Sequence, residues 1–202
     1  MKKNKISKNW INKQKRDIYV RQSKIEGYRS RAAYKLQEIN DKFKVFKNGL
    51  SIIDLGAAPG SWSQFISKKY KDSKVVSIDL KEMDPINKTF QIKGDFTNEL
   101  QQKIIIKYFK DKIDIVLSDM AVNTTGNKNL DSIVTGELCL EALNFAFKTL
   151  KKDGKFISKL FMGSSFNEIV AIAKKKNLWK FIFLSHLLVE NIRKKISLFV
   201  NI

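Results

Sequence analysis

Two parts of the sequence carry residues suited to binding a ligand. Residues 54–63 (DLGAAPGSWS) lead from a predicted strand through small residues and two glycines into a predicted helix. Glycine lets the backbone approach a ligand closely, and a helix N-terminus offers free N–H groups to a carboxylate or phosphate. Asp79 ends the next predicted strand, where an acidic side chain can accept hydrogen bonds from ribose hydroxyls. The two features favour a cofactor with a ribose, and a plain strand-to-helix turn is the alternative.

The glycine spacing of this loop disfavours two common nucleotide-binding classes. Gly56 and Gly60 are separated by three residues, whereas the dinucleotide fingerprint has the form G-x-G-x-x-G. The loop also lacks the Gly-Lys-Ser/Thr sequence of a P-loop. An NAD-dependent oxidoreductase and a P-loop NTPase are therefore both disfavoured.

Short β-branched runs alternate with amphipathic stretches from residue 49 onward. Strands are predicted at 50–55, 74–79, 89–93, 113–118, 154–160, 181–185 and 196–201. Helices are predicted at 61–70, 98–109, 131–150 and 165–177. This alternation predicts an α/β fold with a mostly parallel, seven-stranded sheet covered by helices on both faces. Ligands in such folds bind at the carboxyl ends of the strands.

The N-terminal part has a different character from the rest. A helix is predicted at 30–43 with a Ser30 cap, an apolar stripe for docking on the sheet, and Arg31 and Lys35 on its opposite face. We expect a basic, mobile segment at 1–20 and a single domain at 21–202. That domain would comprise a helical appendage at 21–48 and a Rossmann-like core at 49–202.

Charge and composition limit the classes of function. The 202 residues contain 39 Lys and Arg against 20 Asp and Glu, a net charge of +19, which favours a nucleic acid as partner. A general drift of the composition toward lysine is the alternative. With one cysteine, Cys139, and one histidine, His186, the sequence predicts no internal disulfide and no cysteine- or histidine-rich metal site. It shows no membrane span or signal peptide, so we expect a cytoplasmic protein. We also expect it to be a monomer.

An ordered set of motifs gives the sequence a family resemblance. Residues 54–64 (DLGAAPGSWSQ) resemble the cofactor loop of the FtsJ or RlmE family of bacterial ribosomal RNA 2′-O-ribose methyltransferases. The other motifs of the set are 27–36 (GYRSRAAYKL), 79–80 (DL), 83–85 (MDP), 94–96 (GDF), 118–121 (SDMA), 159–161 (KLF) and Gly163. The resemblance spans about residues 8 to 170, and the order of the motifs makes it specific.

The resemblance implies a Rossmann-like fold, S-adenosylmethionine as cofactor and no metal. The implied reaction is methylation of the 2′-hydroxyl of a uridine ribose in large-subunit ribosomal RNA, late in ribosome assembly. By position, Gly60 and Trp62 would line the methionine side of the cofactor, Asp79 would hold its ribose hydroxyls and Asp95 its adenine amino group.

The resemblance also implies a catalytic set. Lys159 matches the family's catalytic lysine and would act as the base, which requires desolvation or a second cation to lower its pKa. Lys35 would be that second cation. Asp119 would orient the lysine and lie near the transferred methyl group.

The C-terminal segment departs from the family pattern from Leu187 onward. Lys195 stands where the family has a glutamate, and Glu190, five residues earlier, is a poor substitute. One alternative is therefore a catalytically impaired RNA-binding assembly factor. Another hypothesis is that the segment results from a shifted reading frame, which the nucleotide sequence would test.

Overall fold

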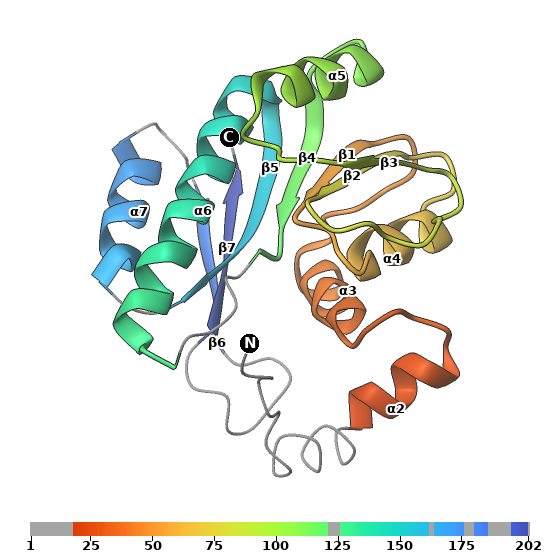
Figure 1. Ribbon diagram of the computed structural model, residues 1–202, viewed down its shortest axis with the longest axis horizontal. Helices are drawn as coiled ribbons and strands as arrows, with labels where there is room; N and C mark the ends of the chain where they lie inside the picture. Colours follow the sequence, from red (N-terminus) through yellow and green to blue (C-terminus); the bar gives the residue numbers. More distant parts are fainter. Residues whose placement is uncertain (1–17, 121–125, 162–163, 176–179, 186–194, 202) are drawn as a thin grey trace, which may run out of the picture.

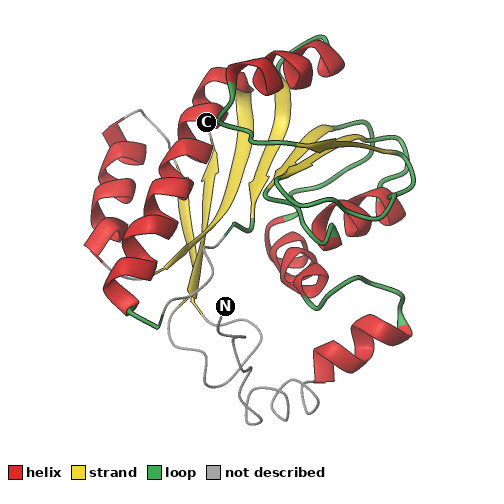
Figure 2. Ribbon diagram, in the orientation of Figure 1, coloured by secondary structure: helices red, strands yellow, loops and turns green. Residues whose placement is uncertain are grey.

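The computed structural model describes residues 18–120, 126–161, 164–175, 180–185 and 195–201. They form one seven-stranded sheet in the order β3-β2-β1-β4-β5-β7-β6, with helices on both faces (Figures 1 and 2). The α/β architecture predicted from the sequence is confirmed. The division at residue 48 stays a prediction. Of the basic segment predicted at 1–20, residues 1–17 lie outside the described residues, and residues 18–20 form the start of a helix.

Four of the six strand pairings are parallel. The strands are β1 (Ser51–Leu55), β2 (Lys74–Asp79), β3 (Thr89–Lys93), β4 (Ile113–Ser118), β5 (Leu150–Phe161), β6 (Lys180–Ser185) and β7 (Lys195–Asn201). Strands β1 to β5 pair in parallel, whereas β7 lies between β5 and β6 and runs antiparallel to both. The carboxyl ends of the first five strands therefore meet at one edge of the sheet.

The helices follow the predicted positions closely. They are α2 (Ile18–Ile25), α3 (Ala32–Phe43), α4 (Ser61–Lys69), α5 (Glu99–Phe109), α6 (Lys128–Thr149) and α7 (Ser164–Lys175). Helix α2 was not predicted, because the apolar residues of its sequence IYVRQSKI do not recur at helical spacing; Ser23 is its buried residue. The start of β5 was predicted four residues late, because the run Lys-Lys-Asp at 151–153 is charged although the strand already begins at Leu150, which pairs with Ile113.

Two apolar clusters cover the two faces of the sheet. Side chains of α3 and α4 pack on one face, and side chains of α5, α6 and α7 pack on the other. Adjacent strand residues alternate between the clusters, so that Ile52 belongs to the first and Ile53 to the second. This alternation is what a strand covered on both faces requires. α3 is therefore anchored to the sheet, and its polar residues are held in fixed positions.

Ser30 contributes to the start of α3, although not as the N-cap residue itself. The N-cap position is occupied by Arg31, which makes no side-chain capping bond. The Ser30 hydroxyl accepts a hydrogen bond from the backbone N–H of Ala32 at 3.2 Å. It also lies 2.7 Å from the hydroxyl of Ser61 at the start of α4. The predicted cap thus also connects two helices.

Phe65 tests the cluster between α3, α4 and the sheet. Its ring is fully buried and contacts the rings of Tyr28 and Phe46. We expect Phe65→Ala to lower the free energy of unfolding by about 3–5 kcal/mol, because it removes a buried ring and leaves a cavity. Urea denaturation measures this loss. The matched change Leu100→Ala, at an exposed position of α5, should stay within about 0.5 kcal/mol. Equal losses would contradict this assignment of the core.

Candidate active site

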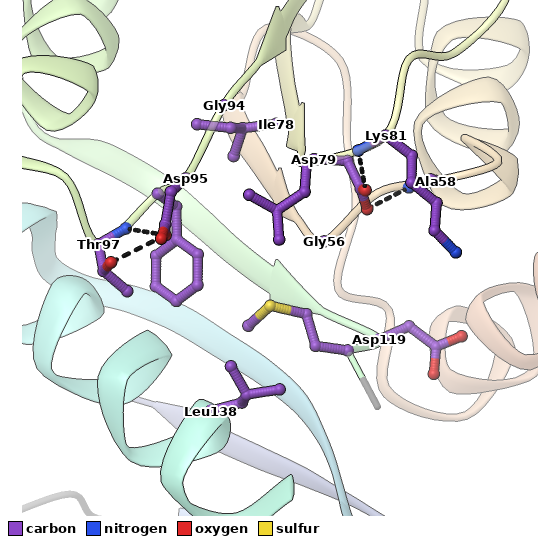
Figure 3. A pocket seen from close by; sticks show the side chains of 13 residues that line it. Gly56, Ala58, Ile78, Asp79, Lys81, Gly94, Asp95, Thr97, Asp119 and Leu138 are labelled. Carbon is purple, nitrogen blue, oxygen red and sulfur yellow. Dashed lines mark hydrogen bonds between the residues drawn. The ribbon is translucent and has the colours of Figure 1, made fainter. Parts of the chain in front are cut away.

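A cavity of about 380 Å³ opens at the carboxyl edge of the sheet (Figure 3). Its size is within the range of small-molecule sites in proteins. The residues that line it are Gly56, Ala58, Ile78, Asp79, Leu80, Lys81, Gly94, Asp95, Phe96, Thr97, Asp119, Met120 and Leu138. Three of the predicted site residues, Asp79, Asp95 and Asp119, are among them. The cavity therefore coincides with the region where the sequence predicted a cofactor site.

Asp79 is fixed at the end of β2 by two backbone N–H groups. Its Oδ2 accepts a hydrogen bond from Ala58 at 2.9 Å, and its Oδ1 accepts one from Lys81 at 2.8 Å (Figure 3). The first bond ties the carboxylate to the loop after β1. Each carboxylate oxygen has a further lone pair for a ligand hydroxyl. Asp79 is thus both a support for the loop and a potential acceptor for a ribose.

Asp95 lies just after β3 and is fixed by its own turn. Its Oδ1 accepts hydrogen bonds from the backbone N–H and the hydroxyl of Thr97, at 2.9 and 2.8 Å. The N–H of Gly94 donates to the backbone oxygen of Asp79 at 2.9 Å, which connects the two acidic residues. Figure 3 shows both carboxylates beside the cavity. Because both residues line the same cavity, one ligand with two polar groups could contact both carboxylates.

Asp119 forms ion pairs with two lysines next to the cavity. Its Oδ1 lies 3.3 Å from Nζ of Lys159 and 3.6 Å from Nζ of Lys35. Lys159 also donates to the backbone oxygen of Asp119 at 3.4 Å. Asp119 follows β4, Lys159 belongs to β5 and Lys35 belongs to α3, so three elements distant in the chain meet here. The structure brings together all three predicted catalytic residues.

The environment lowers the pKa of Lys159 below its ordinary value. Burial of the ammonium group is the largest cause, and the positive charge of Lys35 acts in the same direction. Asp119 opposes them through its charge and its hydrogen bond. The side chain of Lys159 is 11% exposed, against 37% for Lys35. A buried lysine with a lowered pKa is the kind that can serve as a base.

Gly60 and Trp62 are not among the residues that line the cavity. Trp62 is buried in the cluster between α3, α4 and the sheet, and its Nε1 donates to the backbone oxygen of Ala32 at 2.8 Å. Gly60 has a φ of +96°, a conformation that favours glycine, and it forms the N-cap of α4. Both residues therefore shape the loop that borders the cavity, and a direct cofactor contact by either stays a prediction.

Gly56 lines the cavity, although it was not among the site residues predicted from the sequence. A side chain at Gly56, which has a φ of +65°, would place its Cβ 2.0 Å from Cγ of Met120. Only glycine fits between the loop and Met120, which also lines the cavity. The fingerprint spacing drew attention to this glycine, but the approach of Met120 could not be derived from the sequence.

Asp54 is a second feature that only the structure reveals. Its carboxylate is buried beneath the loop, and its Oδ2 accepts hydrogen bonds from the N–H and the hydroxyl of Ser63, at 3.1 and 2.7 Å. The hydroxyl of Ser77 donates in turn to that of Ser63. The pKa of Asp54 is raised to about 7, mainly by burial, and the negative charges of Asp119 and Asp79 contribute to the rise. The hydrogen bonds from Ser63 act in the opposite direction and lower it.

Other residues named from the sequence fall outside the site or outside the described ranges. Cys139 is buried in the cluster on the α6 face, with its pKa raised by burial to about 11. His186 and Glu190 lie outside the described residues. The backbone of Lys195 begins β7 and pairs with Phe161, two residues after Lys159. Within the described ranges, no group of three or more His, Cys, Asp or Glu could hold a metal ion.

Comparison with known proteins assigns the chain to a family. The sequence model described as "FtsJ-like methyltransferase" matches residues 28–185. The chain belongs to the FtsJ-like methyltransferase family. It is a methyltransferase that uses S-adenosylmethionine, as the sequence indicated. The matched range ends at residue 185, and the atypical segment from Leu187 lies beyond it.

Relatives named "Ribosomal RNA large subunit methyltransferase E" match most of the chain. That of Pelagibacter ubique (strain HTCC1062) is 66% identical over 175 residues, which cover 87% of this chain and 86% of the relative. That of Rickettsia akari (strain Hartford) is 49% identical over 170 residues, which cover 81% and 75%. The alternative of a catalytically impaired assembly factor has no support in these matches.

Solved structures agree with the family. A Plasmodium falciparum chain assigned to the ribosomal RNA methyltransferases superposes with a TM-score of 0.75 at 32% identity, covering 86% of this chain and 97% of that one. A Streptococcus mutans protein, solved in complex with SAH, superposes with a TM-score of 0.51 at 15% identity, covering 78% and 89%. The second likeness concerns the fold alone.

Asp54 makes the stability of the protein depend on pH. Its pKa rises from 3.8 in the unfolded chain to about 7 in the folded one, so folding favours the protonated carboxyl. The stabilisation is complete below about pH 4 and is lost as the pH rises to about 7. We expect wild type to lose stability relative to Asp54→Asn over this window, as measured by denaturant unfolding at each pH. A constant difference between the two proteins would contradict the pKa shift.

Proposed function

We propose that the protein transfers the methyl group of S-adenosylmethionine to the 2′-hydroxyl of a uridine ribose in large-subunit ribosomal RNA, late in ribosome assembly. The observation that carries the proposal is the cluster of Lys159 and Lys35 around Asp119, which itself lines a cavity of about 380 Å³. Methylation of an alcohol needs an aligned oxygen and a base to remove its proton. This cluster supplies a base with a lowered pKa.

The residues around the cavity fit the cofactor. S-adenosylmethionine supplies an electrophilic methyl group when it is bound. Asp79 would accept hydrogen bonds from its ribose hydroxyls, and Asp95 would accept one from its adenine amino group, because both carboxylates line the cavity with lone pairs to spare. Gly56 keeps the loop after β1 thin enough for Met120 and the ligand to share the space. Asp119 lies at the end of the cavity nearest the catalytic lysines.

Lys159 acts as the base in this proposal. Its Nζ, in the neutral amine form, takes the proton of the ribose hydroxyl as the oxygen attacks, and later releases it to solvent. Asp119 fixes the direction of Nζ through contacts of its carboxylate and its backbone oxygen, at 3.3 and 3.4 Å. Lys35 favours the neutral form of Lys159 by adding a second positive charge.

The RNA assignment rests on charge and on the relatives. The excess of 19 positive charges suits a partner covered with phosphates. The names of the relatives specify the large ribosomal subunit, and we extend that substrate to this chain. None of the helices in the described ranges combines the length and apolar character needed to cross a bilayer. A ribosomal substrate would be met in the cytoplasm, and we propose that the protein acts there as a monomer.

Lys159→Met should abolish methyl transfer to large subunits that lack this modification while leaving cofactor binding intact. The reason is that methionine fills the space of lysine without offering a base. Transfer of labelled methyl from S-adenosylmethionine measures the loss, which we expect to be about 100-fold or more. Lys155→Met is the matched control. Lys155 lies four residues earlier on β5, and its Nζ donates to the backbone oxygen of Val45 rather than contacting Asp119. Activity retained by Lys159→Met would exclude the lysine as base.

Lys35→Gln should move the pH dependence of the rate toward higher pH. Loss of the second cation raises the pKa of Lys159, so a larger fraction of it stays protonated at a given pH. The measurement is the pH profile of kcat, whose rising limb reports the base in the bound complex. Lys42→Gln, at the exposed end of the same helix, should leave the limb in place. Coincident limbs for wild type and Lys35→Gln would remove Lys35 from this role.

A further inference from the structure

Arg29 connects the two loops that border the cofactor cavity. Its Nη1 donates to the backbone oxygen of Pro59 at 2.9 Å, and its Nη2 donates to those of Asp84 and Pro85, both at 2.8 Å. Pro59 belongs to the loop after β1, which contributes Gly56 and Ala58 to the cavity. Residues 84 and 85 belong to the loop after β2, which contributes Leu80 and Lys81. The side chain of Arg29 therefore joins the loop after β1 to the loop after β2.

The guanidinium group is suited to this position. Its donors lie in a rigid plane and point in different directions, so one group can bond to three carbonyl oxygens on separate segments. The oxygen of Asp84 also accepts a hydrogen bond from Nε2 of Gln91 at 3.0 Å, which fixes the second loop from its other side. A lysine ammonium is a single point and could serve only one loop well.

Arg29 is itself held firmly against the start of α4. Its backbone N–H donates to Oε1 of Gln64 at 3.0 Å, and Nε2 of the same glutamine donates to the backbone oxygen of Gly27 at 2.8 Å. The contact between the hydroxyls of Ser30 and Ser61 lies next to it. The segment before α3 is therefore attached along the cofactor loop, and its attachment does not depend on the guanidinium group alone.

Gly60 shows how closely Arg29 approaches the loop. A Cβ on Gly60 would lie 2.9 Å from Nη1 of Arg29 and 2.6 Å from Cδ1 of Ile86. The guanidinium group and Ile86 therefore close over the loop backbone at the residue that precedes α4. Gly60 is needed both for its φ of +96° and for this approach.

We propose that Arg29 is a positioning residue that preorganises both loops for S-adenosylmethionine and sets them relative to α3, which carries Lys35. The inference rests on the function proposed above. Its role is to bring the loop after β1 and the loop after β2 into the geometry that binds cofactor before the cofactor arrives. Loops ordered in advance bind more tightly, because less conformational freedom is lost on binding.

The test compares Arg29→Met and Arg29→Lys with Arg21→Met, a change of an exposed arginine on α2. Calorimetry measures the Kd for S-adenosylmethionine, and methyl transfer to large subunits measures KM for the cofactor and kcat. We expect Arg29→Met to raise both Kd and KM about tenfold, with a smaller effect on kcat, since preorganisation is lost and the base is untouched. Arg29→Lys should be intermediate, and Arg21→Met should match wild type.

Two readouts separate a positioning role from a general loss of structure. Thermal unfolding without cofactor should give Arg29→Met nearly the wild-type midpoint, and hydrogen exchange should accelerate at the amide of Gly60, which bonds to Ala57 in the loop. A uniform rise in exchange with a lower midpoint would overturn the proposal. Arg29→Lys, with the charge retained, provides the same comparison in case the methionine variant fails to fold.

Failure of this inference is distinct from failure of the proposed function. If wild type binds cofactor and methylates RNA while Arg29→Met binds cofactor equally well, the positioning role is excluded. If the variant loses only RNA affinity, with a reduced salt dependence, Arg29 is a phosphate contact and the proposal is overturned. If wild type itself neither binds S-adenosylmethionine nor transfers methyl, the proposed function fails first.

Discussion

The site depends on one carboxylate that holds two ammonium groups at the edge of a parallel sheet. Asp119 follows β4, and the register that pairs Ser118 with Ser158 brings it beside Lys159 on β5. Lys35 reaches the same oxygen from α3. Without the carboxylate, the two ammonium groups would repel each other, and nothing would compensate for the hydration that they lose on burial. Burial and the charge of Lys35 lower the pKa of Lys159 although the carboxylate opposes them, so Asp119 holds the lysine in place while its surroundings favour the neutral amine.

The rest of the fold keeps this cluster beside the cavity that Asp119 lines. The apolar side of α3 packs on the same face of the sheet as α4, which fixes the distance from Lys35 to the strand ends. Trp62 strengthens that contact through its bond to Ala32. Beneath the loop, Asp54 and Ser63 hold the start of α4 to β1. The loop after β1, helix α4 and the two lysines therefore form one connected structure.

The sequence predicted the features that depend on local pattern and on motif order. Strands β1 to β4 follow their β-branched runs within a residue, and the order of motifs identified Lys35, Asp119 and Lys159 before their contacts were known. Features that depend on tertiary contacts were out of reach. No periodic pattern in a single sequence indicates them. They are the insertion of β7 between β5 and β6, the short helix α2, the core position of the Trp62 indole and the three carbonyl partners of Arg29.

The proposed reaction of this site is methylation of a ribose hydroxyl of large-subunit ribosomal RNA. The most direct measurement incubates the protein with labelled S-adenosylmethionine and large subunits that lack the modification, digests the RNA to nucleosides, and locates the label by mass spectrometry. We expect one labelled nucleoside, a uridine with the methyl group on its ribose, and in undigested RNA the phosphodiester bond 3′ of this nucleotide should resist alkali. Label on a base, or no label in RNA although the cofactor binds, would contradict it.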